Sequence, residues 1–178
     1  TLMNRYDDFW RVTDDALTFA AHQVHVTLTE DKRDQILQTF LATKAWPDAL
    51  PALKRMKARG LRLSFLANLT TAMLDRWVDN AGLQGIFGQH LSTDAVQAFK
   101  PAPRAYQMGV DHFGCSRSSI VFAAFGGWDA AGAKAFGYPT FWVNRARQPI
   151  EELGQSPDGQ GDTLDDLDAF LTSLKHPG

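Results

Sequence analysis

Three polar residues stand where a folded chain could bring them together to do chemistry. Asn68 follows an apolar segment, Lys100 precedes a proline-rich helix start, and Asp129 follows a second apolar segment. A lysine beside an aspartate can keep a carboxylate ionised and offset charge that develops during a reaction. An aspartate in the first turn of a helix also stabilises the helix dipole, so Asp129 could serve its helix alone. The residue types leave both interpretations open.

These three residues need elements that hold them at one place. From residue 46 onwards apolar strand patterns alternate with helical patterns, which predicts an α/β protein with a parallel sheet covered on both faces. The segment 119–125 is continuously apolar after Ser119 and predicts a strand buried on both faces. Ligands of open parallel sheets bind at the carboxyl ends of the strands, where Asn68 and Asp129 are expected. The other predicted strands are 61–68, 87–93 and 139–144, the predicted helices are 46–60, 70–83, 100–114, 128–136 and 164–174, and 147–162 is predicted to be a polar loop.

The first 45 residues show only helical patterns. Apolar and aromatic residues recur there at three- and four-residue spacing, first around Phe9 and then from about Glu30 to Thr43. We expect two helices and no strand in this part.

Composition excludes several classes of protein. The 178 residues are 44% hydrophobic and 21% charged, with a formal net charge of -2 and no clustering of basic residues, which argues against nucleic-acid binding. No apolar run approaches the ~18–20 residues of a membrane span. Cys115 is the only cysteine, so no disulfide forms within the chain, and a reducing cytoplasm is expected. The five histidines show no metal-binding spacing, since His22 and His25 have no third ligand nearby, and no metal site is expected.

Five segments together are typical of one enzyme family. They are LMNRYDDFWRVTDDAL (2–17), LSFLANLTTAML (63–74), LSTDAVQAFKPAPRAYQ (91–107), GWDAAGAKAFGYPTFWVNR (127–145) and EELGQSPD (151–158). Over essentially its whole length the chain resembles the L-2-haloacid dehalogenases of the haloacid dehalogenase superfamily. The resemblance implies a Rossmann-like three-layer parallel-sheet core at 46–178, a small helical cap at 1–45, a homodimer, and no metal or other cofactor.

The resemblance also implies a reaction. Such enzymes hydrolyse short 2-haloalkanoic acids to 2-hydroxy acids and halide, with inversion at C2. An aspartate displaces the halide to form an ester, which water then cleaves, so that one difficult displacement becomes two easier steps. The family pattern places this aspartate, a following threonine, a halide-binding arginine and the central strand ahead of Thr1. We therefore expect this chain by itself to be inactive.

Lys100 and Asp129 match catalytic positions of the family. Lys100 would pair with the nucleophile, and Asp129 would bind Lys100 and help to position the hydrolytic water. The alternative for Lys100 is an exposed lysine ahead of a helix that begins with prolines.

Four more residues match substrate- or halide-binding positions. Asn68 would belong to the halide cradle, although an asparagine after a strand is usually a turn residue. Tyr106 matches an active-site tyrosine, and ordinary packing is the alternative. Trp128 and Phe9 match aromatic walls of the pocket, although buried aromatics are more often plain core.

Three positions depart from the family pattern. Ala67 replaces a serine that binds the substrate carboxylate, and Ala124 and Gly126 stand in a loop where the family has Ser-Ser-Asn. Losing one positioning hydrogen bond can cost about a hundredfold in rate. A non-catalytic domain that binds a partner or dimerises is therefore the alternative. A phosphatase of the same superfamily is disfavoured, because it needs acidic residues for Mg²⁺ near Asp129 and a hydroxyl at position 67.

Overall fold

The computed structural model describes residues 5–174, and the chain divides into two compact units. The first unit comprises residues 1–45 and 64–99, and the second comprises 46–63 and 100–178, as far as they are described. The sequence predicted a cap domain at 1–45 and a core domain at 46–178. The two units are defined by contacts within the chain and do not test this division, which stays a prediction.

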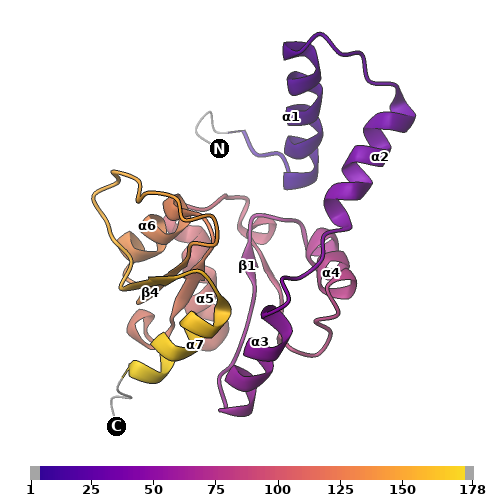
Figure 1. The fold of residues 1–178 in the computed structure, drawn as a ribbon. Helices are drawn as coiled ribbons and strands as arrows, with labels where there is room; N and C mark the ends of the chain where they lie inside the picture. The colour runs from indigo at the N-terminus through magenta and orange to yellow at the C-terminus, as the bar shows by residue number, and fades with distance from the viewer. Residues whose placement is uncertain (1–4, 175–178) are drawn as a thin grey trace. The chain divides into compact units, whose positions relative to one another are not determined.

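In the first unit the two predicted N-terminal helices are confirmed as α1 (Phe9–Gln23) and α2 (Glu30–Leu41). Each starts where a side chain accepts a hydrogen bond from the first turn: Asp8 from the Arg11 N–H, and Thr29 from the Lys32 N–H. Such caps satisfy backbone donors that a helix start leaves without a partner. Figure 1 shows both helices at the indigo end of the chain.

The rest of the first unit is a short parallel pair of strands with one α-helix and a 3-10 helix, η1 (Thr93–Val96). β1 (Leu66–Ala67) pairs with β2 (Leu91–Ser92), and α4 (Thr71–Asn80) lies between them in sequence. The predicted strand 61–68 is therefore much shorter than expected. A small core joins α2 to α4 and contains Leu41, Leu69, Met73 and Leu74.

The second unit is a three-layer α/β structure, as predicted. Its sheet has the order β3-β4-β5, all parallel, with β3 at Phe122–Ala124, β4 at Thr140–Val143 and β5 at Gly159–Gly161. Successive strand side chains point to opposite faces. Phe141 and Val143 therefore pack with α3 (Ala49–Ala58) and α7 (Leu164–Ser173), while Trp142 packs with α6 (Gly127–Phe136) on the other face. In Figure 1, β4 lies between α6 and α7.

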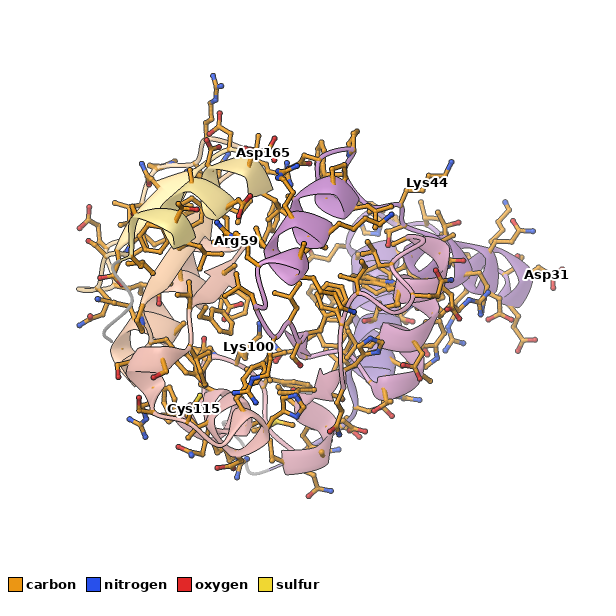
Figure 2. All side chains as sticks on the ribbon, turned by 90° about the horizontal axis from the view of Figure 1, so that it is seen from below. Asp31, Lys44, Arg59, Lys100, Cys115 and Asp165 are labelled. Carbon is orange, nitrogen blue, oxygen red and sulfur yellow. The ribbon has the colours of Figure 1, made fainter. Side chains whose placement is uncertain are left out.

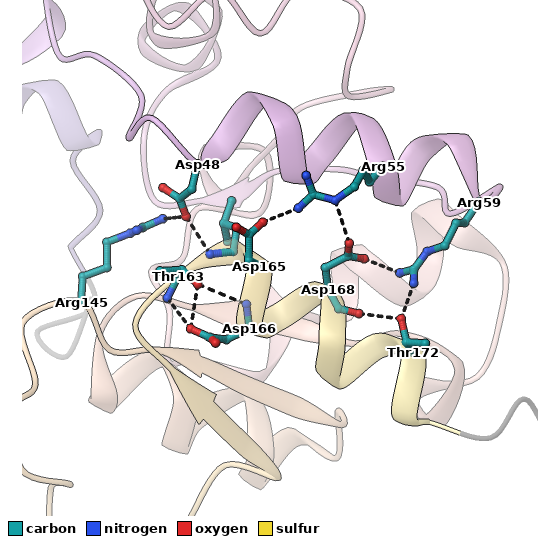
Figure 3. A network of polar contacts seen from close by, with 10 residues as sticks. Asp48, Arg55, Arg59, Arg145, Thr163, Asp165, Asp166, Asp168 and Thr172 are labelled. Atoms are coloured by element: carbon teal, nitrogen blue, oxygen red, sulfur yellow. Dashed lines mark hydrogen bonds and ion pairs between the residues drawn. The ribbon is translucent and has the colours of Figure 1, made fainter.

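Ion pairs fasten α3 to α7 (Figure 3). Arg55 binds both Asp165 and Asp168, and Arg59 binds Asp168 at 2.6 Å. Asp48, just before α3, accepts hydrogen bonds of 2.8 Å from Arg145 and from the backbone N–H of Leu164. Arg145 follows β4, so this aspartate ties the end of the central strand to the starts of two helices.

Two details of the second unit differ from the sequence predictions. The segment 119–125 is not buried on both faces, because Ala123 is exposed and the Phe125 side chain is 66% exposed. Ala124 packs toward α6, and Val121 packs on the opposite face against the core formed with α3 and α7, but Ala123 on that same face is left uncovered. The predicted loop 147–162 also contains a strand, β5, whose sequence Gly-Gln-Gly has little tendency to form one.

Within residues 5–174, no helix is both long and apolar enough to cross a membrane.

Candidate active site

Lys100 and Asp129 form a buried ion pair in the second unit. The Lys100 Nζ lies 2.6 Å from Asp129 Oδ2, and the two side chains are 10% and 9% exposed. Asp129 stands in the first turn of α6, just beyond the carboxyl end of β3, where the sequence placed it. In Figure 2, Lys100 lies among other side chains, whereas Asp31 projects from the end of α2. The interpretation of Lys100 as an exposed lysine is wrong.

Tyr106 completes the arrangement around Asp129. It lies on α5 (Pro103–Phe113), is fully buried, and donates a hydrogen bond of 2.7 Å to Asp129 Oδ1. Burial, then the negative charge of Asp129 and this hydrogen bond, raises the pKa of the Tyr106 hydroxyl well above its ordinary value. Tyr106 therefore stays a neutral donor. The approach of α5 to α6 requires glycine at 132, where a Cβ would stand 2.5 Å from the Tyr106 Oη and 2.7 Å from the Pro101 Cβ.

This geometry defines what the group can do chemically. Each carboxylate oxygen of Asp129 accepts from a different donor, so the carboxylate is held in one orientation. An ammonium carries three N–H donors, so Lys100 can bind Asp129 and a second anionic group together. Such a group can offset charge on a nucleophile or on a leaving anion in a site that excludes water.

The three second-unit residues near this pair have different environments. Trp128 is 41% exposed, and its indole Nε1 lies 2.8 Å from where a Cβ at Gly126 would stand. A side chain at 126 would therefore displace the indole. Ala124 is buried in an apolar cluster with Ala130 and Trp142, beneath α6. Glycine at 126 and alanine at 124 thus suit the packing around them, and neither position supplies a hydrogen-bonding side chain.

The other predicted site residues lie in the first unit. Asn68 follows β1, and its Oδ1 accepts a hydrogen bond of 3.3 Å from the buried Thr93 hydroxyl. Ala67 is the last residue of β1 and is partly buried. Phe9, at the start of α1, contacts the edge of Phe99, with ring centroids 6.0 Å apart. The functional roles assigned to all these positions stay predictions.

Sequence reasoning did not single out three residues that contact predicted site residues within their own units. Thr93 orients the Asn68 amide, Phe122 places its ring beside Lys100, and Tyr138 donates a 2.5 Å hydrogen bond to the Tyr106 carbonyl oxygen. Of these three, only Phe122 could have been found from the sequence. Side chains alternate along a strand, so Phe122 lies on the same face as the predicted site position Ala124.

The structure describes the surroundings of His22, His25 and Cys115. His22 and His25 are exposed, and within residues 5–174 no group of three or more His, Cys, Asp or Glu side chains could hold a metal ion. Cys115 is partly buried and follows Gly114, whose left-handed backbone ends α5. His176 lies outside the described residues.

Comparison with known proteins identifies the class. The second unit has a parallel α/β fold with a buried lysine–aspartate pair at a strand end. Residues 2–137 of the chain match the sequence model of haloacid dehalogenase-like hydrolases. The chain belongs to this hydrolase family. Its relatives within the family are 2-haloacid dehalogenases, and its fold is the one seen in their crystal structures.

Two relatives and two structures illustrate the similarity. The chain is 39% identical to haloacetate dehalogenase H-2 of Moraxella sp. (strain B) over 88% of its own length and 70% of that protein. It is 37% identical to the (S)-2-haloacid dehalogenase of Pseudomonas sp. (strain YL), over 92% and 71%. The crystal structure of the L-2-haloacid dehalogenase RSc1362 superposes with a TM-score of 0.93 at 35% identity, covering 96% of this chain and 75% of that one. A Xanthobacter autotrophicus L-2-haloacid dehalogenase with chloropropionic acid covalently bound gives 0.89 at 28% identity, covering 97% and 79%.

Proposed function

We propose that this chain carries the lysine–aspartate half of a hydrolytic dehalogenase that converts short 2-haloalkanoic acids into 2-hydroxy acids and halide. The observation that carries the proposal is the pair of Lys100 and Asp129, 2.6 Å apart, buried, and held by Tyr106. A buried pair of this kind at the carboxyl end of a strand suits a reaction in which negative charge moves between a carboxylate and a leaving group.

The reaction divides into two steps. A carboxylate attacks C2 of the substrate, the carbon–halogen bond breaks with its electron pair on the halide, and an ester forms. Water then attacks the ester, loses a proton, and releases the 2-hydroxy acid and the free carboxylate. We assign no residue of this chain as the attacking carboxylate, so the first step is a prediction about the complete gene product.

The residues of this chain would contribute as follows. Lys100 offsets charge on the attacking carboxylate and on the ester oxygen, and Asp129 orients Lys100 and the hydrolytic water. Asn68 would donate to the departing halide. Trp128 and Phe9 would wall the pocket and remove water from the halogen, which strengthens every electrostatic contact with it.

Halide release by the complete gene product tests the proposal. With L-2-chloropropionate, chloride should appear in proportion to 2-hydroxypropionate, without loss of rate in EDTA. Lys100→Met and Asp129→Asn should each lower kcat about a hundredfold or more. Lys134→Met is the matched control. Lys134 lies on α6 and also binds an aspartate, Asp158, but both side chains are about one-third exposed (33% and 36%). Absence of halide release from every short 2-halo acid would overturn the proposal.

A non-catalytic domain is the second candidate, and the apolar replacements favour it. Ala67, Ala124 and Gly126 carry no group that could bind the substrate carboxylate or water. In-frame translation of the DNA upstream of the Thr1 codon separates the two candidates. A strand end of the type Asp-x-Tyr-Gly-Thr supports the enzyme, whereas an immediate stop codon supports the binding or dimerisation module.

We also propose a cytoplasmic homodimer, as the resemblance implies. The helices α1 and α2 expose apolar side chains that a partner could cover, among them Phe19 at 64% and Ile36 at 45%. Light scattering at micromolar concentration should give twice the mass of one chain, and Phe19→Asp should reduce it toward the monomer.

A further inference from the structure

The ammonium of Lys100 lies beside an aromatic ring as well as a carboxylate. Its Nζ is 5.2 Å from the centroid of the Phe122 ring, within the ~6 Å range at which a cation is attracted to the face of an aromatic ring. The end of β3 and the residues that follow it, Ala124-Phe125-Gly126, have no side chain that could accept a hydrogen bond from Lys100. At this edge of the second unit, the Lys100 ammonium therefore lies against a ring face.

Other aromatic residues of the site hold the Phe122 ring in place. Tyr138 stacks on it with centroids 5.8 Å apart and planes at 4°, and Tyr106 meets it edge-on at 5.4 Å and 83°. The Tyr138 hydroxyl donates to the Tyr106 carbonyl oxygen at 2.5 Å, so the two tyrosines are themselves fastened together. Tyr106 also binds Asp129, and the residues that orient the carboxylate therefore orient the ring.

We propose that Phe122 is a positioning residue of this site, whose ring face holds the Lys100 ammonium in place against Asp129. The proposal rests on the proposed function for its effect on catalysis. A ring attracts a cation without accepting a proton, so it stabilises the ammonium without competing for the short hydrogen bond to Asp129. This matters most where little water reaches the charge, as for the 10% exposed Lys100 side chain.

Phe136 shows how this role differs from ordinary packing. Its ring belongs to the same aromatic cluster, 5.7 Å from Tyr106 and 5.0 Å from Tyr138. The cation near Phe136 is Arg117, 3.9 Å from its centroid, and not Lys100. The two phenylalanines thus share both tyrosine neighbours and differ in the cation, which makes Phe136 a matched control.

The experiment places mono-, di- and trifluorinated phenylalanine at position 122 of the complete protein. Fluorine keeps the shape of the ring and removes negative charge from its face step by step. One readout is kcat and KM for halide release, and the other is the rate at which Lys100 is acylated at fixed pH, followed by mass spectrometry. Across the series we expect kcat to fall about tenfold with KM nearly constant, and acylation of Lys100 to accelerate about as much.

The same substitutions at position 136 should change neither readout. Phe122→Leu, which removes the ring, should lie at the far end of the series. An acylation rate of Lys100 that does not depend on the number of fluorines overturns the proposal, even if Phe122→Leu lowers activity, because packing alone would then explain the loss. The acylation readout needs no turnover. A stepwise change in it therefore supports the role of Phe122 even if no 2-halo acid is a substrate, an outcome that would overturn only the proposed function.

Discussion

Tyr106 on α5 donates a hydrogen bond of 2.7 Å to the carboxylate of Asp129 on α6, and both residues are almost completely buried. Lys100 binds the second oxygen of the same carboxylate. The carboxylate therefore receives donors from two places in the chain, one neutral and one charged. This arrangement fixes where the ammonium lies, and two predictions follow directly from it.

Removing both members of the Lys100–Asp129 pair should destabilise the protein by less than the sum of the losses caused by removing each member alone. A single substitution leaves a buried charge without its partner, which costs about 3–5 kcal/mol. In urea unfolding, Lys100→Met and Asp129→Leu should each lower the free energy of unfolding by about this amount, and the double variant should lose less than the sum. Breaking the more exposed pair of Lys134 and Asp158 should cost less than about 1 kcal/mol. Strict additivity of the two substitutions at the site would contradict the prediction.

The hydroxyls of Tyr106 and Tyr138 should have different effects on activity. Tyr106→Phe removes a donor from a buried carboxylate, so it should lower kcat about tenfold or more and destabilise the protein by about 1.5–3 kcal/mol. Tyr138→Phe removes a bond to a backbone carbonyl, so it should cost about 1 kcal/mol with a much smaller change in kcat. Steady-state kinetics and urea unfolding of both variants compare the two. Equal losses of kcat would show that the hydroxyl of Tyr106 has no special role.

The stability of the second unit should depend on pH through Asp48. Burial by itself raises the pKa of this carboxyl, but hydrogen bonds from Arg145 and the Leu164 N–H outweigh it and hold the pKa below its ordinary value of 3.8. A lowered pKa in the folded state stabilises the protein above the unfolded pKa, and this contribution is lost as pH falls through the folded value. Urea unfolding between pH 2.5 and 6 should therefore show stability that declines below about pH 4.

The Asp48→Asn variant isolates this contribution. Its stability should decline less steeply below pH 4, because the residue no longer takes up a proton on unfolding. Some decline should remain, because the pKa values of Asp158 and Asp166 are also lowered. Burial raises the pKa of Asp158, but hydrogen bonds from Lys134 and the Thr140 N–H outweigh it. The pKa of Asp166 is lowered mainly by hydrogen bonds from Thr163. A profile for Asp48→Asn that parallels the unsubstituted protein would be contrary to this prediction.

Gly159 should not tolerate alanine. A Cβ at this position would stand 2.8 Å from a ring carbon of Phe170 and 3.0 Å from one of Phe141, between the sheet and α7. Forcing a methyl group into a filled core costs about 1–3 kcal/mol. Thermal unfolding should show a lower Tm for Gly159→Ala, whereas Gln160→Ala, on the exposed side of the same strand, should leave it nearly unchanged. Equal Tm values for the two variants would show that the rings can move aside.

The sequence alone determined the local features of this protein. Helices begin where Asp8, Thr29 and Thr70 cap them, because capping depends on residues only three positions apart. The alternation of strands and helices predicted the parallel α/β fold, and the family pattern placed Lys100 and Asp129 before any contact between them was known. Caps and strand–helix alternation depend on residues close together in the sequence, and the family pattern is shared by related sequences.

Only the tertiary structure decided the features that depend on distant partners. β5 exists because Gly159–Gly161 pairs with β4 and its glycines leave room for Phe170 and Asp166. Ala123 is exposed while its neighbour Ala124 is buried beneath α6, a difference that no pattern within 119–125 reveals. The ring of Phe122 meets Lys100 only after β3 and the start of α5 pack together. Pairing and packing join residues far apart in sequence, so the side chains that orient the site can be recognised only in the folded chain.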